Sequence, residues 1–303
     1  MSESSGDDRD IFVTAKDGLR LHVREYGAVG GPQLPVVCLP GLTRTIADFA
    51  ALAPALVNDP QRPRRVIALD SRGRGGSDSD SNPDNYNVAV ELADLVTVLA
   101  ALNVGPAVFI GSSRGGILTM LLAAAQPAAI AGAVLHDIGP AVEIGGVMRI
   151  KSYVGRLPAP RSYAEGAEIL QRLFGAQFPR QTSAQWLAAA QRTWRMTEHG
   201  LQPTYDVQLA RSLADVSPDR PLPALWNEFD ALRPVPVLVI RGANSDILSA
   251  ATAAEMAARH PGLQILEVPD QGHVPLLEGE EIISAIAAFV AACDRARAGA
   301  AAL

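Results

Sequence analysis

The chain has 303 residues, of which 48% are hydrophobic and 19% are charged, and its formal net charge is −6. This composition is typical of a globular protein with a sizeable core and argues against disorder. The sequence has no basic stripe, which argues against nucleic acid as a partner, and no apolar run near the roughly 18 residues that a membrane span needs.

Strand and helix patterns alternate along most of the chain. The first two expected strands flank Lys16-Asp17-Gly18, a sequence that favours a hairpin turn. The later alternation predicts a mainly parallel sheet covered by helices on both faces. Strands are expected at residues 10–14, 19–26, 35–39, 65–69, 107–110, 131–136, 235–240 and 263–268, and helices at 46–57, 86–102, 117–125, 250–260 and 279–298.

Residues 139–233, named here the cap segment, break this alternation. They contain no convincing strand, and prolines divide them into expected helices near 162–174, 182–195, 206–213 and 222–232. An insertion at the carboxyl ends of sheet strands is a candidate lid over a site. The expected organisation is a core of residues 1–138 and 234–303 with a helical cap at 139–233, and the alternative is an ordinary second packing layer.

Terminal and cysteine features indicate the compartment. Residues 1–10 are polar and acidic, without the basic start and apolar run of a secretory signal, and are expected to fray. Cys38 lies in an expected apolar strand and Cys293 in an expected C-terminal helix, which favours buried free thiols over a disulfide or a metal site. These features predict a cytoplasmic protein without a metal.

The most informative motif is Gly111-Ser112-Ser113-Arg114-Gly115, a G-x-S-x-G sequence between an expected buried strand and an expected buried helix. In this context the central serine, Ser113, is exposed at the sheet edge above a helix N-terminus. Ser112 is interpreted as a packing residue. Because a serine hydroxyl is a weak nucleophile without a base, the motif predicts that a carboxylate and a histidine follow later in the chain.

One of the five histidines fits the role of that base. His273 lies in the loop after the last expected strand, from which an imidazole can reach over the sheet edge to the serine. The others have other interpretations: a hairpin position for His22, packing for His136, the cap segment for His199 and a helix end for His260.

Three aspartates precede His273 and are candidates for the acid that orients its ring. Asp246 follows the seventh strand, on the loop next to the histidine loop, and is the preferred candidate. Asp137 follows the sixth strand and is the alternative, although a strand-end carboxylate also commonly bonds loop amides. Asp270 lies three residues before the histidine.

Two backbone N–H groups are candidate donors to an oxyanion. One belongs to Arg114, directly after the serine, and the other to Leu42, in the loop after the third strand, where Gly41 allows a close approach. Arg44 in the same loop is a possible contact for a substrate carboxylate or carbonyl, or else a member of an ion pair. Possible contacts from the cap segment are Trp186 and Trp194.

These motifs resemble those of the α/β-hydrolase fold family, and the resemblance covers nearly the whole chain. It is carried by Pro40-Gly41-Leu42, Asp70-Ser71-Arg72-Gly73-Arg74-Gly75, Gly111-Ser112-Ser113-Arg114-Gly115-Gly116, Gly242-Ala243-Asn244-Ser245-Asp246 and Gln271-Gly272-His273.

The resemblance implies an eight-stranded, mostly parallel sheet, a helical cap after the sixth strand, no cofactor, and a triad of Ser113, Asp246 and His273. Family members with aspartate at the elbow are haloalkane dehalogenases or epoxide hydrolases, and Ser113 argues against both. Pro40 stands where many members have a histidine, which leaves the backbone donor of this loop intact.

The expected function is a serine hydrolase that cleaves a small to medium carboxylic ester through an acyl-enzyme, with water as the second substrate. Lactone opening, C–C bond hydrolysis and perhydrolysis on the same triad remain alternatives, as does a non-catalytic ligand receptor that retains the triad. The fold alone does not select among substrates.

Overall fold

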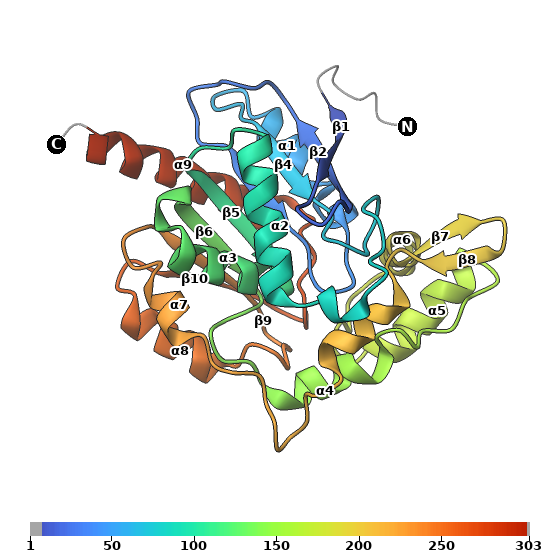
Figure 1. Cartoon of the computed structure of the whole chain (residues 1–303). Helices are drawn as coiled ribbons and strands as arrows, with labels where there is room; N and C mark the ends of the chain where they lie inside the picture. The colour runs from blue at the N-terminus through green and yellow to red at the C-terminus, as the bar shows by residue number, and fades with distance from the viewer. Residues whose placement is uncertain (1–7, 302–303) are drawn as a thin grey trace.

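Eight strands form the central sheet in the order β1-β2-β4-β3-β5-β6-β9-β10 (Figure 1). The computed structural model describes residues 8–301. Strand β2 runs antiparallel to both of its neighbours, and all the other pairs from β4 to β10 are parallel. The strands are β1 Arg9–Thr14, β2 Arg20–Tyr26, β3 Val36–Leu39, β4 Val66–Leu69, β5 Ala107–Ser112, β6 Ile130–His136, β9 Val237–Gly242 and β10 Gln264–Val268.

Helices cover both faces of this sheet. The helices of the described chain are α1 Leu52–Val57, α2 Val88–Ala101, α3 Arg114–Ala125, α4 Ile144–Tyr153, α5 Tyr163–Phe174, α6 Ser183–Thr193, α7 Trp226–Asp230, α8 Ala250–Arg259 and α9 Glu280–Ala301, of which α5 and α6 do not lie on the sheet. Short 3₁₀ helices occur at η1 Ile46–Phe49, η2 Pro83–Asn85, η3 Pro127–Ala129 and η4 Val207–Leu213. The apolar residues of α1 and α9 pack on one face of the sheet, and those of α2, α3 and α8 pack on the other.

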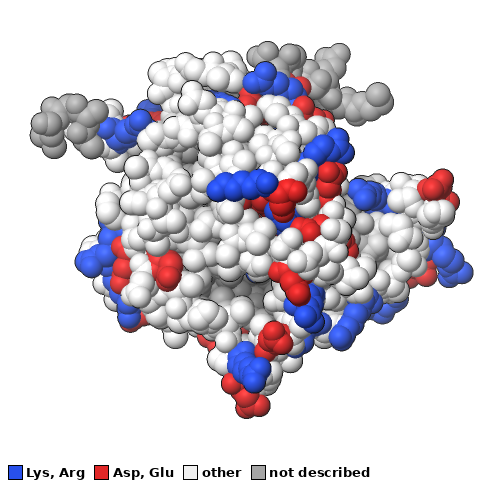
Figure 2. Space-filling model, in the orientation of Figure 1, with Lys and Arg blue, Asp and Glu red and all other residues white. Residues whose placement is uncertain are grey.

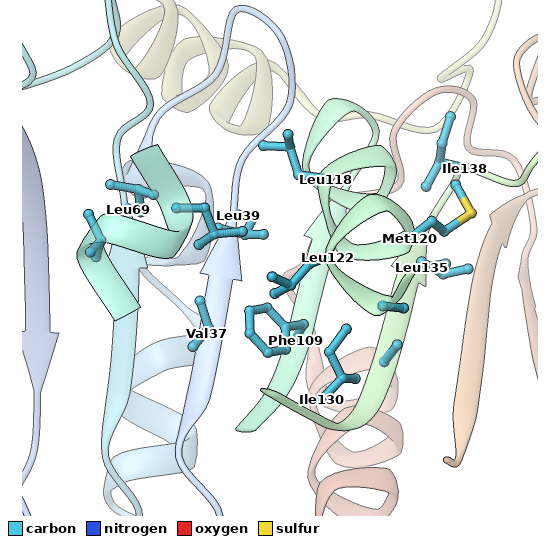
Figure 3. Packing of buried hydrophobic residues seen from close by; sticks show 14 of the residues in the cluster. Val37, Leu39, Leu69, Phe109, Leu118, Met120, Leu122, Ile130, Leu135 and Ile138 are labelled. Atoms are coloured by element: carbon cyan, nitrogen blue, oxygen red, sulfur yellow. The ribbon is translucent and has the colours of Figure 1, made fainter. Parts of the chain in front are cut away.

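The central strands are buried on both faces, which explains their nearly continuous apolar sequences. In Figure 3, Phe109 of β5 lies below Leu122 of α3, and Leu135 of β6 lies beside Met120 of α3. Burying such a side chain contributes about 1.5–3 kcal/mol relative to leaving it exposed. The close packing of α3 on β5 and β6 therefore fixes the turn that joins β5 to α3.

The sequence-based expectation of eight strands with an antiparallel start is confirmed. One expected helix, over residues 46–57, is instead divided into η1 and α1. Helix α4 was not expected. Residues 9 and 10 pair in β1 rather than fraying, whereas the rest of the N-terminal expectation, for residues 1–7, lies outside the described residues.

The cap segment contains α4, α5, α6, η4 and α7, together with a small antiparallel hairpin of β7 Trp194–Thr197 and β8 Gly200–Pro203. The expectation that it contains no strand is therefore wrong. Helices α5 and α6 and the hairpin lie to the right of the sheet in Figure 1 and share a small apolar core of their own. Helix α7 packs instead with the main core, through Phe229.

Charged side chains of both signs are interspersed over the face shown in Figure 2. Both cysteines are free and buried, as expected. In the part of the chain that the structure describes, no helix combines the length and the apolar character needed to cross a membrane.

Candidate active site

The turn between β5 and α3 holds Ser113 in a strained conformation. Ser113 has a φ of 49°, in the left-handed region that residues other than glycine rarely adopt. The two motif glycines are required by close packing. A Cβ atom on Gly115 would lie 2.0 Å from the carbonyl oxygen of Leu39, and one on Gly111 would lie 2.5 Å from the carbonyl oxygen of Gly115. The G-x-S-x-G pattern is thus a steric consequence of this turn.

The structure brings Ser113 and His273 together, as the sequence predicts. The hydroxyl oxygen of Ser113 lies 2.8 Å from Nε2 of His273. Ser113 follows β5, and His273 lies in the loop after β10, so both side chains come from the carboxyl ends of parallel strands. This arrangement places a possible base within hydrogen-bond distance of a possible nucleophile.

The carboxylate that contacts His273 belongs to Asp137, directly after β6. Nδ1 of His273 lies 2.8 Å from Oδ2 of Asp137, whose side chain is fully buried. The same carboxylate accepts hydrogen bonds from the N–H of Gly242 at 2.8 Å and from the hydroxyl of Ser245 at 2.6 Å. Because an ionised carboxylate only accepts, Nδ1 carries the ring proton and Nε2 is free to accept the proton of Ser113.

The structure does not bring Asp246 to His273, which corrects the sequence-based preference. Asp246 instead forms a two-pronged ion pair with Arg149 of α4, with N–O distances of 2.5 and 2.8 Å. Although burial alone would raise the pKa of Asp246, the Arg149 guanidinium lowers it. Helix α4 packs closely on this loop, because a Cβ on Gly146 would lie 2.1 Å from the carbonyl oxygen of Asp246. Asp246 thus binds α4, a helix that the sequence analysis does not predict, rather than His273.

The two expected oxyanion donors lie beside Ser113. Gly41 brings the loop after β3 so close that its added Cβ would lie 3.5 Å from Cβ of Ser113. The N–H of Leu42, in this loop, has no hydrogen-bond partner within residues 8–301. Arg114 is the first residue of α3, so its N–H has no partner inside the helix.

A buried carboxylate, Glu91 of α2, supports both sides of this arrangement. It accepts hydrogen bonds from Arg74 at 2.9 Å and from Arg114 at 2.8 Å, and Nε of Arg74 donates to the carbonyl oxygen of Leu42. Burial alone would raise the pKa of Glu91, but the two guanidinium groups lower it to about 2. The loop Gly73-Arg74-Gly75-Gly76 therefore lies at the base of the site.

A pocket opens over Ser113 and His273, between the core and the cap segment. Its apolar wall comes mainly from the cap segment, and Trp186 contributes to it as expected. Trp194 does not, because it is fully buried in the small core of the cap segment, where it packs on Gly166. The apolar and aromatic lining residues are Leu42, Ile150, Tyr153, Leu157, Leu170, Phe174, Phe178, Trp186, Ala189, Tyr205, Val274, Pro275, Leu276 and Leu277.

His136 and Ser112 also line the pocket, in addition to packing in the sheet. Nδ1 of His136 lies 3.0 Å from the hydroxyl of Ser112. Burial lowers the pKa of His136 to about 4, so its ring is neutral at neutral pH. The remaining histidines lie elsewhere: His22 contacts Asp70, His260 contacts the carbonyls of Leu232 and Val235, and His199 is exposed.

The pocket has a charged end. Both Nε and Nη2 of Arg44 bind the carboxylate of Asp48, at 2.7 and 2.5 Å. Arg192 of α6 binds Glu278 at 2.8 Å, and its Nε lies 3.7 Å from Asp48. The ion-pair interpretation of Arg44 is confirmed, and Arg44 also lines the pocket, whereas its contact with a substrate carboxylate or carbonyl stays a prediction.

Sequence reasoning missed Ser245, Glu91 and Arg192. Ser245 directly precedes Asp246, in a motif in which the sequence analysis names only Asp246 as a candidate site residue. Glu91 is a carboxylate on the buried side of an expected amphipathic helix, a position at which an ionised group requires partners. Arg192 had no comparable signal, because its partners are distant in the sequence.

Glu91→Gln should lower the free energy of unfolding by about 3 kcal/mol, because two buried guanidinium groups lose their carboxylate. The pKa of Glu91 is about 2, below its ordinary value of 4.5. Its contribution is therefore complete above pH 4.5 and is lost as the pH falls towards 2. Denaturant unfolding of both proteins at several pH values measures this contribution. The exposed Glu168→Gln is the matched control, and equal stability of the two variants would contradict the assignment.

Comparisons with known proteins agree with this fold. The family model for the alpha/beta hydrolase fold matches residues 35–280. The crystal structure of an alpha/beta hydrolase from Novosphingobium aromaticivorans is 41% identical, covers 94% of this chain and 98% of its own, and has a TM-score of 0.87.

Two named relatives match most of the chain. The 3-hydroxybutyrate-oligomer hydrolase of Cupriavidus necator is 37% identical over 276 residues, which are 87% of this chain and 91% of that protein. The 2-(acetamidomethylene)succinate hydrolase of Mesorhizobium japonicum is 27% identical over 276 residues, which are 90% of this chain and 92% of that protein. The family model and the extent of these matches confirm the resemblance found in the sequence, and the chain belongs to the α/β hydrolase fold family.

Proposed function

We propose that this protein is a carboxylic ester hydrolase in which Ser113, His273 and Asp137 form the catalytic triad. The observation that carries the proposal is the continuous chain from the Ser113 hydroxyl through both nitrogens of His273 to Asp137, with two contacts of 2.8 Å. Membership of the family supports hydrolysis as the class of reaction, and the serine at the elbow favours acyl transfer.

The reaction proceeds in two halves. Nε2 of His273 accepts the proton of Ser113 as its oxygen attacks the ester carbonyl, and the resulting imidazolium is stabilised by Asp137. The proton then passes to the leaving alcohol, and an acyl-enzyme remains on Ser113. In the second half, His273 takes a proton from water, the hydroxide attacks the acyl carbon, and the acid product leaves as the proton returns to Ser113.

The backbone N–H groups of Leu42 and Arg114 stabilise the oxyanion of each tetrahedral intermediate. Their free donors on either side of Ser113 support this role. Fixed donors contribute more to the transition state than to the ground state because they need no reorganisation as charge develops. Glu91 keeps both donors in place through Arg74 and Arg114.

The cap segment acts as the lid of the pocket and selects the substrate. Its apolar and aromatic wall favours a small to medium ester, because such pockets bury apolar surface and use few polar groups for orientation. The similarity to a 3-hydroxybutyrate-oligomer hydrolase makes short oligoesters of a hydroxy acid the first class to assay.

Ser113→Ala should lower kcat by at least about three orders of magnitude while the protein folds normally, because the nucleophile is removed. The measurements are turnover of a nitrophenyl butanoate and labelling by a fluorophosphonate probe. Ser112→Ala, which removes the neighbouring hydroxyl, should still be labelled. Labelling of Ser113→Ala would contradict the assignment, and a wild-type protein that is labelled but hydrolyses no ester would support the receptor alternative.

Asp137→Asn should lower kcat by about 10⁴, because the amide stabilises the wrong tautomer of His273. Asp246→Asn, the matched change on the neighbouring loop, should lower kcat by less than about tenfold, because Asp246 binds Arg149. The two variants are compared on one ester after their folding is checked by circular dichroism. A larger loss for Asp246→Asn would return the role of the acid to Asp246.

Activity should decrease as the pH falls, because His273 must be neutral to accept the proton of Ser113. The profile of kcat/KM against pH should show one ionisation on its acid side. His136 does not produce this ionisation, because burial keeps its pKa near 4. The control is His136→Asn, which should retain the same acid limb, and a rate that stays constant down to pH 4 would exclude His273 as the base.

A further inference from the structure

All four charged side chains that line the pocket belong to one connected group: Arg44, Asp48, Arg192 and Glu278. They gather on the loop after β3, on η1, on α6 and on the loop after β10, while the remaining wall is largely apolar. Two cations and two anions give this group a net charge of zero. Such a group within an otherwise apolar pocket marks the place where a polar part of a ligand can be bound.

Hydrogen-bond donors outnumber acceptors in this group. Both oxygens of Asp48 accept from Arg44, and Glu278 accepts from Nη1 of Arg192. In contrast, Nε of Arg192 is buried without a hydrogen-bond partner among the described residues, and it lies 3.7 Å from Oδ1 of Asp48. Nη1 of Arg44 has only a long contact of 3.4 Å, to the hydroxyl of Thr193. A buried donor without a partner is costly, so a ligand that supplies an acceptor gains from this arrangement.

The group lies within reach of the reacting atoms. Gly41 stands between Arg44 and Ser113, because its added Cβ would lie 3.3 Å from Cγ of Arg44 and 3.5 Å from Cβ of Ser113. Because Arg44, Arg192 and Ser113 line one pocket, an acceptor on a substrate can meet a guanidinium group while its ester lies at Ser113.

We propose that Arg192, together with Arg44, forms a subsite for a free carboxylate carried by the ester substrate. The proposal rests on the proposed ester hydrolase function and specifies its substrate class as acidic esters. A carboxylate offers two acceptor oxygens in the geometry that guanidinium groups bind best. An amine or ammonium group offers no acceptor that would satisfy the free N–H groups.

A purely structural role makes a different prediction. Arg192 belongs to the cap segment and Glu278 and Asp48 belong to the core, so this group also fastens one to the other. If fastening were its entire role, loss of Arg192 would slow neutral and acidic esters by the same factor. If Arg192 binds a carboxylate, its loss changes the ratio between them.

The test compares matched pairs of esters. One pair, 4-nitrophenyl hydrogen adipate and 4-nitrophenyl methyl adipate, differs in a carboxylate on the acyl part. The other pair, 4-(butanoyloxy)benzoate and its methyl ester, differs in a carboxylate on the alcohol part. In at least one pair the wild-type kcat/KM should be about tenfold higher for the acid, mainly through KM.

Arg192→Gln should bring this ratio close to one, and Arg192→Gln combined with Glu278→Gln should do the same without leaving Glu278 unpaired. Arg172→Gln, at an exposed position on α5, is the control and should keep the wild-type ratio. A wild-type ratio of one or less in both pairs would overturn the subsite, as would a ratio that survives in the variants. Hydrolysis of neutral esters in those cases leaves the proposed function intact, whereas no hydrolysis of any ester refutes that function itself.

Discussion

The buried carboxylate of Asp137 is the constraint on which the site depends. It accepts hydrogen bonds from the Gly242 backbone, the Ser245 hydroxyl and the His273 ring. A carboxylate removed from water is costly unless several donors replace the water, so the three contacts form as a set. That set joins β6, the end of β9 and the loop after β10, and it turns Nε2 of His273 towards Ser113.

A second buried carboxylate has the corresponding role on the opposite side of Ser113. Glu91 fixes Arg114, at the start of α3, and Arg74, which holds the carbonyl of Leu42. The His273 imidazole and the loop that contains Leu42 are thus each supported by a buried anion. Catalytic groups must be held in position by the residues that surround them, because groups held only by exposed loops lose the required precision.

The sheet, the elbow serine and the histidine could be predicted because local rules determine them. Buried parallel strands have apolar sequences, and the turn at Ser113 tolerates only glycine at two neighbouring positions. The choice between Asp137 and Asp246 depends instead on tertiary packing. A correct choice requires knowing that Arg149 of α4 binds Asp246. Helix α4 is difficult to predict from sequence, because Gly145 and Gly146 have low helix propensity. The hairpin of β7 and β8 was missed because strands of four residues carry little periodicity.

Apolar packing and several ion pairs together join the cap segment to the core, and this has an evolutionary consequence. The cap segment supplies most of the apolar pocket wall but no atom of the chain from Ser113 to Asp137. Its wall can therefore diverge by point substitution without disturbing the chemistry, provided that the fastenings survive. Among the described residues those fastenings include four arginines of the cap segment, each paired with an acid of the core: Arg149 with Asp246, Arg180 with Asp270, Arg192 with Glu278 and Arg211 with Asp84. The fold thus separates a pocket wall whose residues are free to vary from a core whose site residues are not. A chimera that exchanges residues 139–233 would acquire new selectivity only if the new segment kept these arginines.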